Sequence, residues 1–409
     1  MTGVQTCALP IFYAHPLFLG FRSQDQFAHL LADALQMRGH HVELRRPVAR
    51  VRAWVPAGRL SKWAGYIDQY LLFPWHVRQR MRRDPPDTLY VFCDQALGPW
   101  VPLAVRRPHV VHCADLLALR SALGEVPENR TSMTGRVYQR FIRRGFAQAR
   151  HFISISEQTR RELHRLGGVT AQTSEVVYLG LNQAYGPMEP DAARQALHAA
   201  GLPMPPGHFL LHVGGGHWYK NTAGVVALYG SYVQGCMAAG QAPMPLWLVS
   251  PPPSAAVQAA LARVPPSGQV RFFQSLPPAA LQGLYALAAV LLFPSLAEGF
   301  GWPIAEAMAC GCQVLTTDEP PMNEVGGEAA HYLPRLQGPQ DMDAWSRAGA
   351  DVLLRVLTAT PEERALRVRA GLQRAAAFSA DGMVERYLAI YRSVLRQERA
   401  GLTADAHMA

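Results

Sequence analysis

Short apolar runs alternate with helix-forming segments along almost the whole chain, and this alternation constrains the fold more than any other feature. The runs in the first half are Ile11–Ala14, His41–Leu44, Thr88–Cys93, Val110–Cys113, His151–Ser154 and Val176–Leu179. Those in the second half are Phe209–Val213, Leu246–Val249, Val270–Phe272, Val290–Phe293 and Val314–Thr316. Because strands that alternate with helices form mainly parallel sheets, the sequence predicts an α/β protein.

A segment rich in proline and glycine, residues 181–207, separates the two halves. We predict an N-terminal domain at residues 1–184, a C-terminal domain at 185–377, and a terminal helix and tail at 378–409 that bridge the two. Each domain should be Rossmann-like, with a parallel sheet, and the two sheets should face each other across a cleft. Ligands in such sheets bind at the carboxyl ends of the strands.

Composition and charge narrow the class of protein further. Apolar residues make up 49% of the 409 positions, but no run reaches 18 residues, so we predict no membrane span and no secretory signal. Residues 1–11 resemble a translated sequencing adapter and are expected not to be native. The six cysteines show no zinc-binding spacing, which favours a reduced, cytoplasmic setting and no metal site.

Positive charge is concentrated in the first half of the chain. Residues 1–180 carry 24 Lys and Arg against 13 Asp and Glu, whereas the remainder has a net charge of −2. The segment Lys62–Arg83 combines aromatic and basic residues, a pattern that suits the surface of an anionic membrane. A helix packed on its own domain, with a solvated basic end, explains the same pattern, and the sequence does not decide between these two interpretations. Arginine-rich coding explains the overall excess of positive charge equally well.

The strongest functional signal is a pair of carboxylates, Glu298 and Glu306, around a strand-to-helix loop. The loop follows the apolar run Val290–Phe293 and contains Gly299, Phe300 and Gly301. Glycine lets backbone amides approach a ligand closely, and a helix N-terminus attracts anions. We place Glu306 in the first turn of the helix. Acidic acceptors beside such amides suit a ligand with both hydroxyls and phosphate, such as a nucleotide-sugar.

A second signal is a glycine-rich loop that ends in a lysine. Gly214, Gly215 and Gly216 follow a predicted strand, and Lys220 and Asn221 precede a predicted helix. Exposed amides and one positive charge would cradle a diphosphate. The spacing matches neither a dinucleotide fingerprint nor a nucleoside-triphosphate loop. An ordinary tight turn with a surface lysine is the alternative interpretation, and the neighbouring carboxylate pair makes it less favoured.

Together these residues resemble family 4, group 1 glycosyltransferases, whose two Rossmann-like domains form the GT-B fold. The Glu-x7-Glu motif matches at Glu298 and Glu306, and the EAMACG stretch matches at 306–311. The resemblance implies a metal-independent enzyme that retains anomeric configuration. It places Glu306 on the donor ribose, Glu298 near the transferred sugar and Lys220 on the diphosphate. It also implies that the terminal helix packs on the N-terminal domain.

The N-terminal half departs from the family pattern at two places. Asp115 matches the second residue of the family's His-Asp pair, but Ala114 stands where the histidine is expected. His112 shares a strand face with position 114, so it either replaces that histidine or is a core residue. The loop near Gly20 lacks the usual glycine pair, and Arg22 is a candidate for a second cation.

The favoured function is transfer of a sugar from a UDP- or GDP-sugar to a glycan or lipid-linked acceptor, as part of polysaccharide biosynthesis. No further cofactor is expected. A nucleotide-sugar epimerase and an inactive nucleotide-sugar-binding homologue are the alternatives. Nucleic-acid binding is disfavoured, because no recognition motif accompanies the arginines. A peripheral contact with the inner face of an anionic membrane is compatible with the charge distribution.

Overall fold

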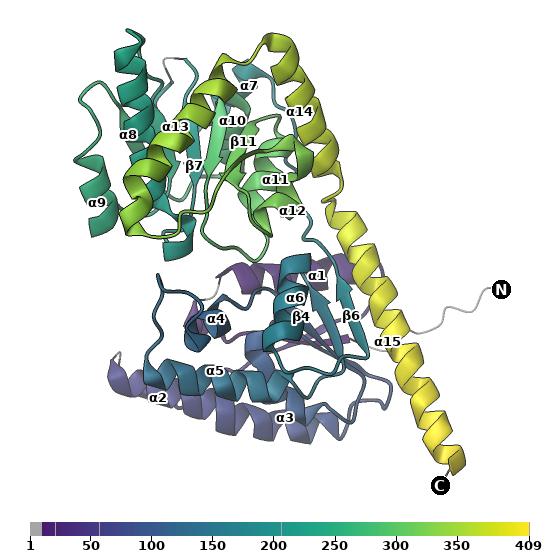
Figure 1. The fold of residues 1–409 in the computed structure, drawn as a ribbon. Coiled ribbons are helices and arrows are strands. Elements are labelled where there is room, and N and C mark those ends of the chain that lie inside the picture. The colour runs from purple at the N-terminus through teal and green to yellow at the C-terminus, as the bar shows by residue number, and fades with distance from the viewer. Residues whose placement is uncertain (1–9, 21, 57, 206, 409) are drawn as a thin grey trace, which may run out of the picture. The chain divides into compact units, whose positions relative to one another are not determined.

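A computed structural model describes residues 10–20, 22–56, 58–205 and 207–408, with side chains except those of residues 22, 23, 59 and 401–408. The chain forms two compact units (Figure 1). Unit 1 comprises residues 1–178 and 381–409, and unit 2 comprises residues 179–380. The cleft expected between the two domains stays a prediction.

Unit 1 is built on a six-stranded parallel sheet in the order β2-β1-β3-β4-β5-β6. Its strands are β1 (Pro10–Tyr13), β2 (Glu43–Arg45), β3 (Leu89–Phe92), β4 (His109–Cys113), β5 (His151–Ser154) and β6 (Thr173–Val176). Its helices are α1 (Arg22–Met37), α2 (Arg59–Ile67), α3 (Phe73–Met81), α4 (Leu117–Leu123), α5 (Met133–Phe146), α6 (Glu157–Leu166) and α15 (Ala380–Met408). A π-helical turn, η3 (Asp68–Leu72), joins α2 to α3, and 3-10 turns occur at Leu17–Leu19, Arg52–Trp54 and Gln95–Leu103.

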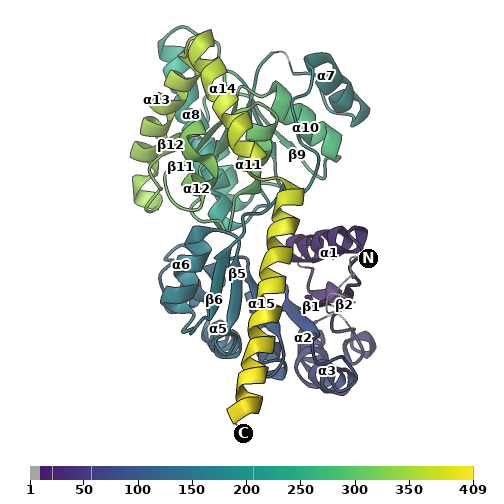
Figure 2. The ribbon, with the colours of Figure 1, turned by 90° about the vertical axis from the view of Figure 1, so that its right-hand side faces the viewer.

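Helices cover both faces of the first sheet, as a parallel sheet requires. On one face, Phe73 of α3 and Phe146 of α5 join the strand residues Tyr90 and Phe92 in one buried cluster. On the other face, α15 packs against the strands through Tyr391, whose ring meets that of Phe12 edge to face. Figure 2 shows α15 passing in front of this sheet, as expected for a terminal helix that returns to the N-terminal domain.

Unit 2 is built on a second parallel sheet, in the order β12-β11-β10-β7-β8-β9. Its strands are β7 (Leu210–Val213), β8 (Leu246–Val249), β9 (Val270–Phe273), β10 (Val290–Phe293), β11 (Gln313–Thr317) and β12 (His331–Leu333). Its helices are α7 (Pro190–Ala199), α8 (Thr222–Ala238), α9 (Ala255–Leu261), α10 (Pro278–Leu287), α11 (Trp302–Ala309), α12 (Met322–Gly326), α13 (Met342–Thr358) and α14 (Pro361–Ala376). Short 3-10 turns lie at Trp218–Lys220, Gly327–Ala329 and Pro339–Asp341.

Three details differ from the sequence-based expectations. The strand expected at Val176–Leu179 lies at Thr173–Val176. The strand β12 was not predicted, because three residues at a sheet edge carry too little apolar pattern. Glu306 lies in the second turn of α11 and not in the first, because the helix already begins at Trp302 with Gly301 as its N-cap. The carboxyl group of Glu306 is therefore displaced along the helix from the amides of the N-terminus.

Two expectations drawn from composition concern the cysteines and the membrane-spanning potential of the helices. The five described cysteines, at positions 93, 113, 236, 310 and 312, are buried free thiols. Among the described residues, no helix is both long and apolar enough to cross a bilayer. Cys7 and most of the residues expected to be foreign lie outside the described ranges.

Candidate active site

The topology of unit 2 fixes where a ligand should bind. The strands to one side of β7 follow it in sequence as β8 and β9, while β10, β11 and β12 lie on its other side. The strand order therefore reverses between β7 and β10. In doubly wound sheets, ligands bind in the crevice at the carboxyl ends of the two strands that flank this reversal. Lys220 follows β7 and Glu298 follows β10, so both signals converge on that point.

Lys220 and Glu298 form a short, largely buried ion pair. Nζ of Lys220 lies 2.7 Å from Oε1 of Glu298, and the two side chains are 13% and 7% exposed. The ammonium also lies 4.9 Å from the centre of the Phe293 ring, within the range of a cation–π contact. A buried charge pair is costly to desolvate and is costlier still to break from one side. The site thus holds one cation and one carboxylate poised for a ligand that carries both phosphate and hydroxyl groups.

Two hydrogen bonds join the loop after β7 to the loop after β10, next to this ion pair. The amide of Leu296 donates to the Tyr219 carbonyl at 2.7 Å, and the side-chain amide of Asn221 donates to the Pro294 carbonyl at 3.0 Å. Asn221 adopts a left-handed conformation with φ of 52°, which asparagine tolerates better than most residues. Asn221 was predicted to bind the donor; the structure gives its buried side chain a role in joining the loops.

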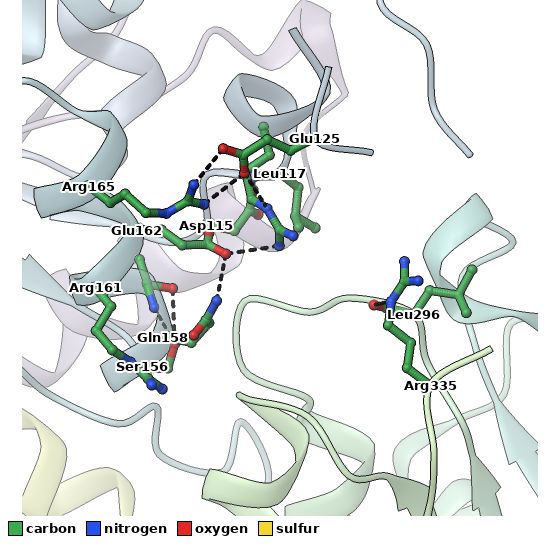
Figure 3. Close-up of polar contacts among 12 residues, drawn as sticks. Asp115, Leu117, Glu125, Ser156, Gln158, Arg161, Glu162, Arg165, Leu296 and Arg335 are labelled. Carbon is green, nitrogen blue, oxygen red and sulfur yellow. Dashed lines mark hydrogen bonds and ion pairs between the residues drawn. The ribbon is translucent and has the colours of Figure 1, made fainter. Parts of the chain in front are cut away.

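Arg335 supports the same loop from the edge strand and was missed by the sequence analysis. It follows β12, and its Nε donates to the Leu296 carbonyl at 2.9 Å (Figure 3). A signal existed, because parallel strands bring residues that follow their carboxyl ends to one edge of the sheet. Because β12 was not predicted, the sequence did not place Arg335 at this edge of the sheet.

The glycine-rich loop provides fewer amides than predicted. The amide of Gly214 donates to the Val249 carbonyl at 3.0 Å, so it is not available to a phosphate, and this part of the prediction is wrong. A Cβ at Gly214 would lie 2.7 Å from Nε2 of His212, which explains the glycine by packing. Gly215 and Gly216 are exposed, and Gly216 has a φ of 76°. These two residues remain the candidates for close backbone approach.

The loop between β10 and α11 leads directly into a helix N-terminus. Gly301 is the N-cap of α11 with a φ of 99°, a conformation that favours glycine. The Phe300 side chain is buried and its ring meets that of Phe378 edge to face at 5.4 Å. Phe300 can therefore offer a ligand only its backbone. Gly299, which is partly exposed, lies directly after Glu298.

Glu306 lies in an aromatic pocket within unit 2. Its side chain is buried, and Tyr285 donates its hydroxyl to Oε2 at 2.8 Å. The ring of Tyr185 packs edge to face against that of Tyr285. Burial raises the pKa of the Glu306 carboxyl to about 7, and the hydrogen bond from Tyr285 and the charge of Lys220 only partly offset this effect. A carboxyl that titrates near neutral pH can accept hydrogen bonds from hydroxyl groups and, when protonated, donate one to them.

In unit 1, the structure favours the core interpretation of His112. The ring is 1% exposed and its Nε2 is 2.8 Å from the hydroxyl of Tyr391 on α15. Phe27 and Tyr387 pack on the same ring, and burial lowers the pKa of His112 to about 3. A neutral ring sealed by three aromatic side chains cannot contact a substrate. The predicted catalytic role of His112 is therefore corrected to a packing role.

This assignment predicts a loss of stability without a specific loss of catalysis. His112→Phe should reduce the free energy of unfolding by about 1–3 kcal/mol, because the Tyr391 hydroxyl loses its buried partner. Tyr391→Phe should cost a similar amount, and the double variant should cost less than the sum of both. Urea unfolding and kcat/KM of the folded variants measure the two effects. A large fall in kcat for a variant that keeps its stability would contradict the packing role.

Asp115 lies where β4 leads into α4. Its Oδ1 accepts a hydrogen bond from the amide of Leu117 at 3.0 Å, and its carbonyl accepts one from Gln95. Figure 3 shows Asp115 beside an ion-pair network in which Glu125 and Arg165 take part. Asp115 lies at the carboxyl end of β4, as predicted. Its Oδ1 atom is used in the hydrogen bond from the Leu117 amide. Arg22 begins α1, and its side chain lies outside the described part of the chain.

Unit 1 contains a buried polar pair of its own, which was not predicted from the sequence. In its sheet the strand order reverses between β1 and β3. His15 follows β1 and Asp94 follows β3, and Nε2 of His15 lies 3.0 Å from Oδ2 of Asp94, with both residues buried. The other carboxylate oxygen of Asp94 accepts from the Ala96 amide. The pair occupies the place where this type of sheet binds ligands. Only the strand order, which sequence does not give, brings the two residues together.

Two family models match the two halves of the chain. The family model described as Glycosyltransferase Family 4 matches residues 24–185, and that of Glycosyl transferases group 1 matches residues 210–354. The O-antigen chain mannosyltransferase B of Escherichia coli is 39% identical over 79 residues, which are 19% of this chain and 20% of that protein. This match thus spans about a fifth of the relative's length.

Solved structures match nearly the whole chain. Sucrose-phosphate synthase from Thermosynechococcus elongatus has a TM-score of 0.68 and 18% identity, over 95% of this chain and 100% of that one. Alr3699/HepE of Anabaena, solved with UDP and glucose, has a TM-score of 0.65 and 16% identity, over 94% and 100%. At these identities the likeness shows the fold. The chain therefore belongs to the group 1 glycosyltransferases of family 4 and has their two-domain α/β GT-B fold.

Proposed function

We propose that the protein transfers a sugar from a nucleoside-diphosphate sugar, UDP- or GDP-linked, to a glycan or lipid-linked acceptor. In this proposal the product retains the anomeric configuration of the donor and no metal ion takes part. The relative named as an O-antigen chain mannosyltransferase supports a glycan acceptor, and membership of the family supports sugar transfer. Polysaccharide biosynthesis is the corresponding pathway class.

The observation that carries the proposal is the ion pair of Lys220 and Glu298 at the strand-order reversal of unit 2. A donor diphosphate would draw the ammonium of Lys220 to its phosphate oxygens. Glu298 would then lose its cation and accept hydrogen bonds from hydroxyls of the sugar. The phosphate thus replaces Glu298 as the partner of Lys220, and the sugar hydroxyls replace Lys220 as the partner of Glu298. Each largely buried charge therefore has a partner both with and without the donor.

The chemical step follows from the same charges. The bond between the anomeric carbon and the β-phosphate oxygen breaks, and negative charge develops on that phosphate. Lys220, the exposed Gly215 and Gly216 and the N-terminus of α11 are the donors proposed to stabilise it in place of a metal. The acceptor hydroxyl attacks from the face that the phosphate leaves, and its proton passes to the departing phosphate. Front-face attack preserves the anomeric configuration.

Turnover measured with a panel of UDP- and GDP-sugars and candidate glycan acceptors tests this proposal. We expect release of nucleoside diphosphate that depends on acceptor and persists in excess EDTA, because fixed donors and not a divalent ion stabilise the leaving group. Proton NMR of the product should show the same anomeric configuration as the donor. Loss of activity in EDTA, restored by Mg²⁺ or Mn²⁺, would contradict the metal-independent step.

The same assay separates the two alternative functions. Donor incubated without acceptor should remain unchanged in its sugar; conversion of that sugar would indicate an epimerase. Binding of a nucleotide-sugar without turnover across a broad acceptor panel would indicate an inactive homologue. Ala114, in place of the histidine expected from the family, is the residue that keeps the second alternative relevant.

A further inference from the structure

Unit 1 carries an apolar surface made of two neighbouring helical segments. On the segment α2–η3–α3, Trp63, Ile67, Leu71 and Trp75 recur every four residues, and on α5 Met133, Val137 and Phe141 do the same. We call these seven residues the aromatic face. All seven are exposed, from 38% for Ile67 to 72% for Met133. Figure 1 shows α2, α3 and α5 on the same face of the sheet of unit 1.

The two segments join through rings, which makes the aromatic face continuous. The Tyr70 and Tyr138 hydroxyls lie 2.6 Å apart, and the Tyr70 ring meets that of Phe141 edge to face at 5.6 Å. Between the segments runs a groove of about 360 Å³ lined entirely by apolar and aromatic side chains, among them Trp63 and Leu71. The hydroxyls of Tyr70 and Tyr138 pair with each other, and the surface of the groove is almost wholly apolar. Contiguous exposed apolar surface of this kind marks an interaction site.

The charges around the aromatic face have one sign. On α5, Arg136, Arg140 and Arg144 also recur every four residues and are exposed, and the helix contains no acidic residue. Lys62 and Arg78 are exposed on the other segment, and the exposed Arg82 directly follows it. The acidic residue of that segment, Asp68, is buried and accepts hydrogen bonds from the backbone amides of residues 50–52. The described side chains of both segments therefore offer a partner only positive charge.

We propose that the aromatic face docks the protein on an anionic lipid bilayer, with the aromatic side chains at the headgroup level and the arginines against lipid phosphates. Tryptophan and tyrosine favour the membrane–water boundary because each ring has an apolar body and a polar edge. Helices with an apolar stripe beside a basic stripe lie in the plane of that boundary. The groove then takes lipid chains.

The charge pattern favours a bilayer over the other possible occupants. A second copy of the chain would bring like-charged arginine stripes together across a symmetric interface, which is unfavourable. A nucleic acid would satisfy the arginines but would leave the aliphatic residues Ile67, Leu71 and Val137 in water. An anionic bilayer satisfies both sets of side chains. The inference concerns a surface of unit 1 and does not depend on the proposed transfer reaction.

Co-sedimentation of the full chain with vesicles, without nucleotide or acceptor, tests the inference. Vesicles of phosphatidylcholine are compared with an equal mixture of phosphatidylcholine and phosphatidylglycerol. We expect clear binding to the anionic vesicles, weaker binding to the neutral ones, and a loss of binding as salt screens the arginines. No binding of the native chain to anionic vesicles at low salt overturns the proposal.

Two variants and a control assign the binding to residues. Arg136→Gln/Arg140→Gln/Arg144→Gln should bind anionic vesicles about a hundredfold more weakly, since each arginine near an anionic surface contributes about fivefold. Leu71→Glu/Phe141→Glu should lose binding to both vesicle types. The control Leu366→Glu/Arg369→Gln changes exposed residues of α14 in unit 2 and should bind as the native chain does.

Two further outcomes also decide against a bilayer. Native-like binding by either of the two variants would mean that this face is not the docking surface. If the native chain is a dimer, and Leu71→Glu/Phe141→Glu yields a monomer that still binds vesicles, the face is an interface between copies. Melting temperatures measured for every variant separate lost binding from unfolding. The arginine variant, whose three replaced side chains are exposed, should melt as the native chain does.

Discussion

Lys220→Met is expected to lower turnover steeply and destabilise the protein, and adding Glu298→Gln is expected to restore stability but not turnover. The single substitution leaves the Glu298 carboxylate largely buried without its cation. Breaking a buried pair from one side costs about 3–5 kcal/mol, whereas replacing both partners by neutral groups is often close to neutral. Loss of one preorganised donor to the leaving group lowers kcat by about 10²–10³. Stability and activity therefore respond differently to the second substitution.

Urea unfolding and steady-state kinetics of the two single variants and the double variant measure this difference. An exposed ion pair of the same unit, Arg263 with Asp343, provides the control. Arg263→Met should cost less than about 1 kcal/mol and leave kcat unchanged, because exposed pairs contribute little. If the double variant regains activity together with stability, the pair serves the fold alone. That result would remove Lys220 from the proposed leaving-group site.

Glu306→Gln is expected to stabilise the ligand-free protein at alkaline pH while weakening its affinity for the donor. Burial raises the pKa of Glu306 to about 7, so the folded state holds a proton that the unfolded chain releases near its ordinary value. This contribution to stability is complete below that ordinary pKa and is lost as the pH rises through about 7. A shift of this size corresponds to a free energy on the order of 3 kcal/mol. Glutamine keeps an acceptor for Tyr285 and does not ionise.

Chemical unfolding between about pH 5 and about pH 8 tests the sign. The advantage of the variant over the native protein should grow up to about pH 7 and level off above that pH. Donor affinity should fall about tenfold to a hundredfold, as expected for hydrogen bonds that involve a charged group. Glu189→Gln, at an exposed carboxylate of the same unit, should leave both quantities unchanged. A variant whose stability runs parallel to that of the native protein at every pH would show that Glu306 has an ordinary pKa.

The sequence was sufficient to predict the fold class because the signals for its elements are local. The helix α6 begins at Glu157 because the Ser156 side chain accepts a hydrogen bond from the Thr159 amide and so fixes the first turn, a signal carried by neighbouring residues. The apolar runs of β5 and β10 likewise have the predicted bounds. The predicted strand ends, glycines and helix start placed Lys220 and Glu298 at the same edge of one sheet. The structure shows them there as an ion pair.

What the sequence could not supply depends on strand order and on the face that each side chain occupies. His15 and Asp94 are 79 positions apart, and only the pairing of β1 with β3 brings them together. The face of β4 that carries His112 is covered by α15, a helix more than 250 residues away. Arg335 depends on β12, which is too short to show a period. The local sequence pattern could not assign roles to these residues, because their contacts are made with segments far away in the chain.

Calorimetric titration of nucleotides into the native protein and into Lys220→Met/Glu298→Gln measures what Lys220 contributes to donor binding. Lys220 is proposed to bind the β-phosphate of the donor, so UDP and GDP are compared with UMP and GMP, which lack that phosphate. We expect the favoured diphosphate to bind the double variant about a hundredfold more weakly than the native protein, while the matching monophosphate binds both alike. Equal affinity of the diphosphate for both proteins would contradict this role of Lys220.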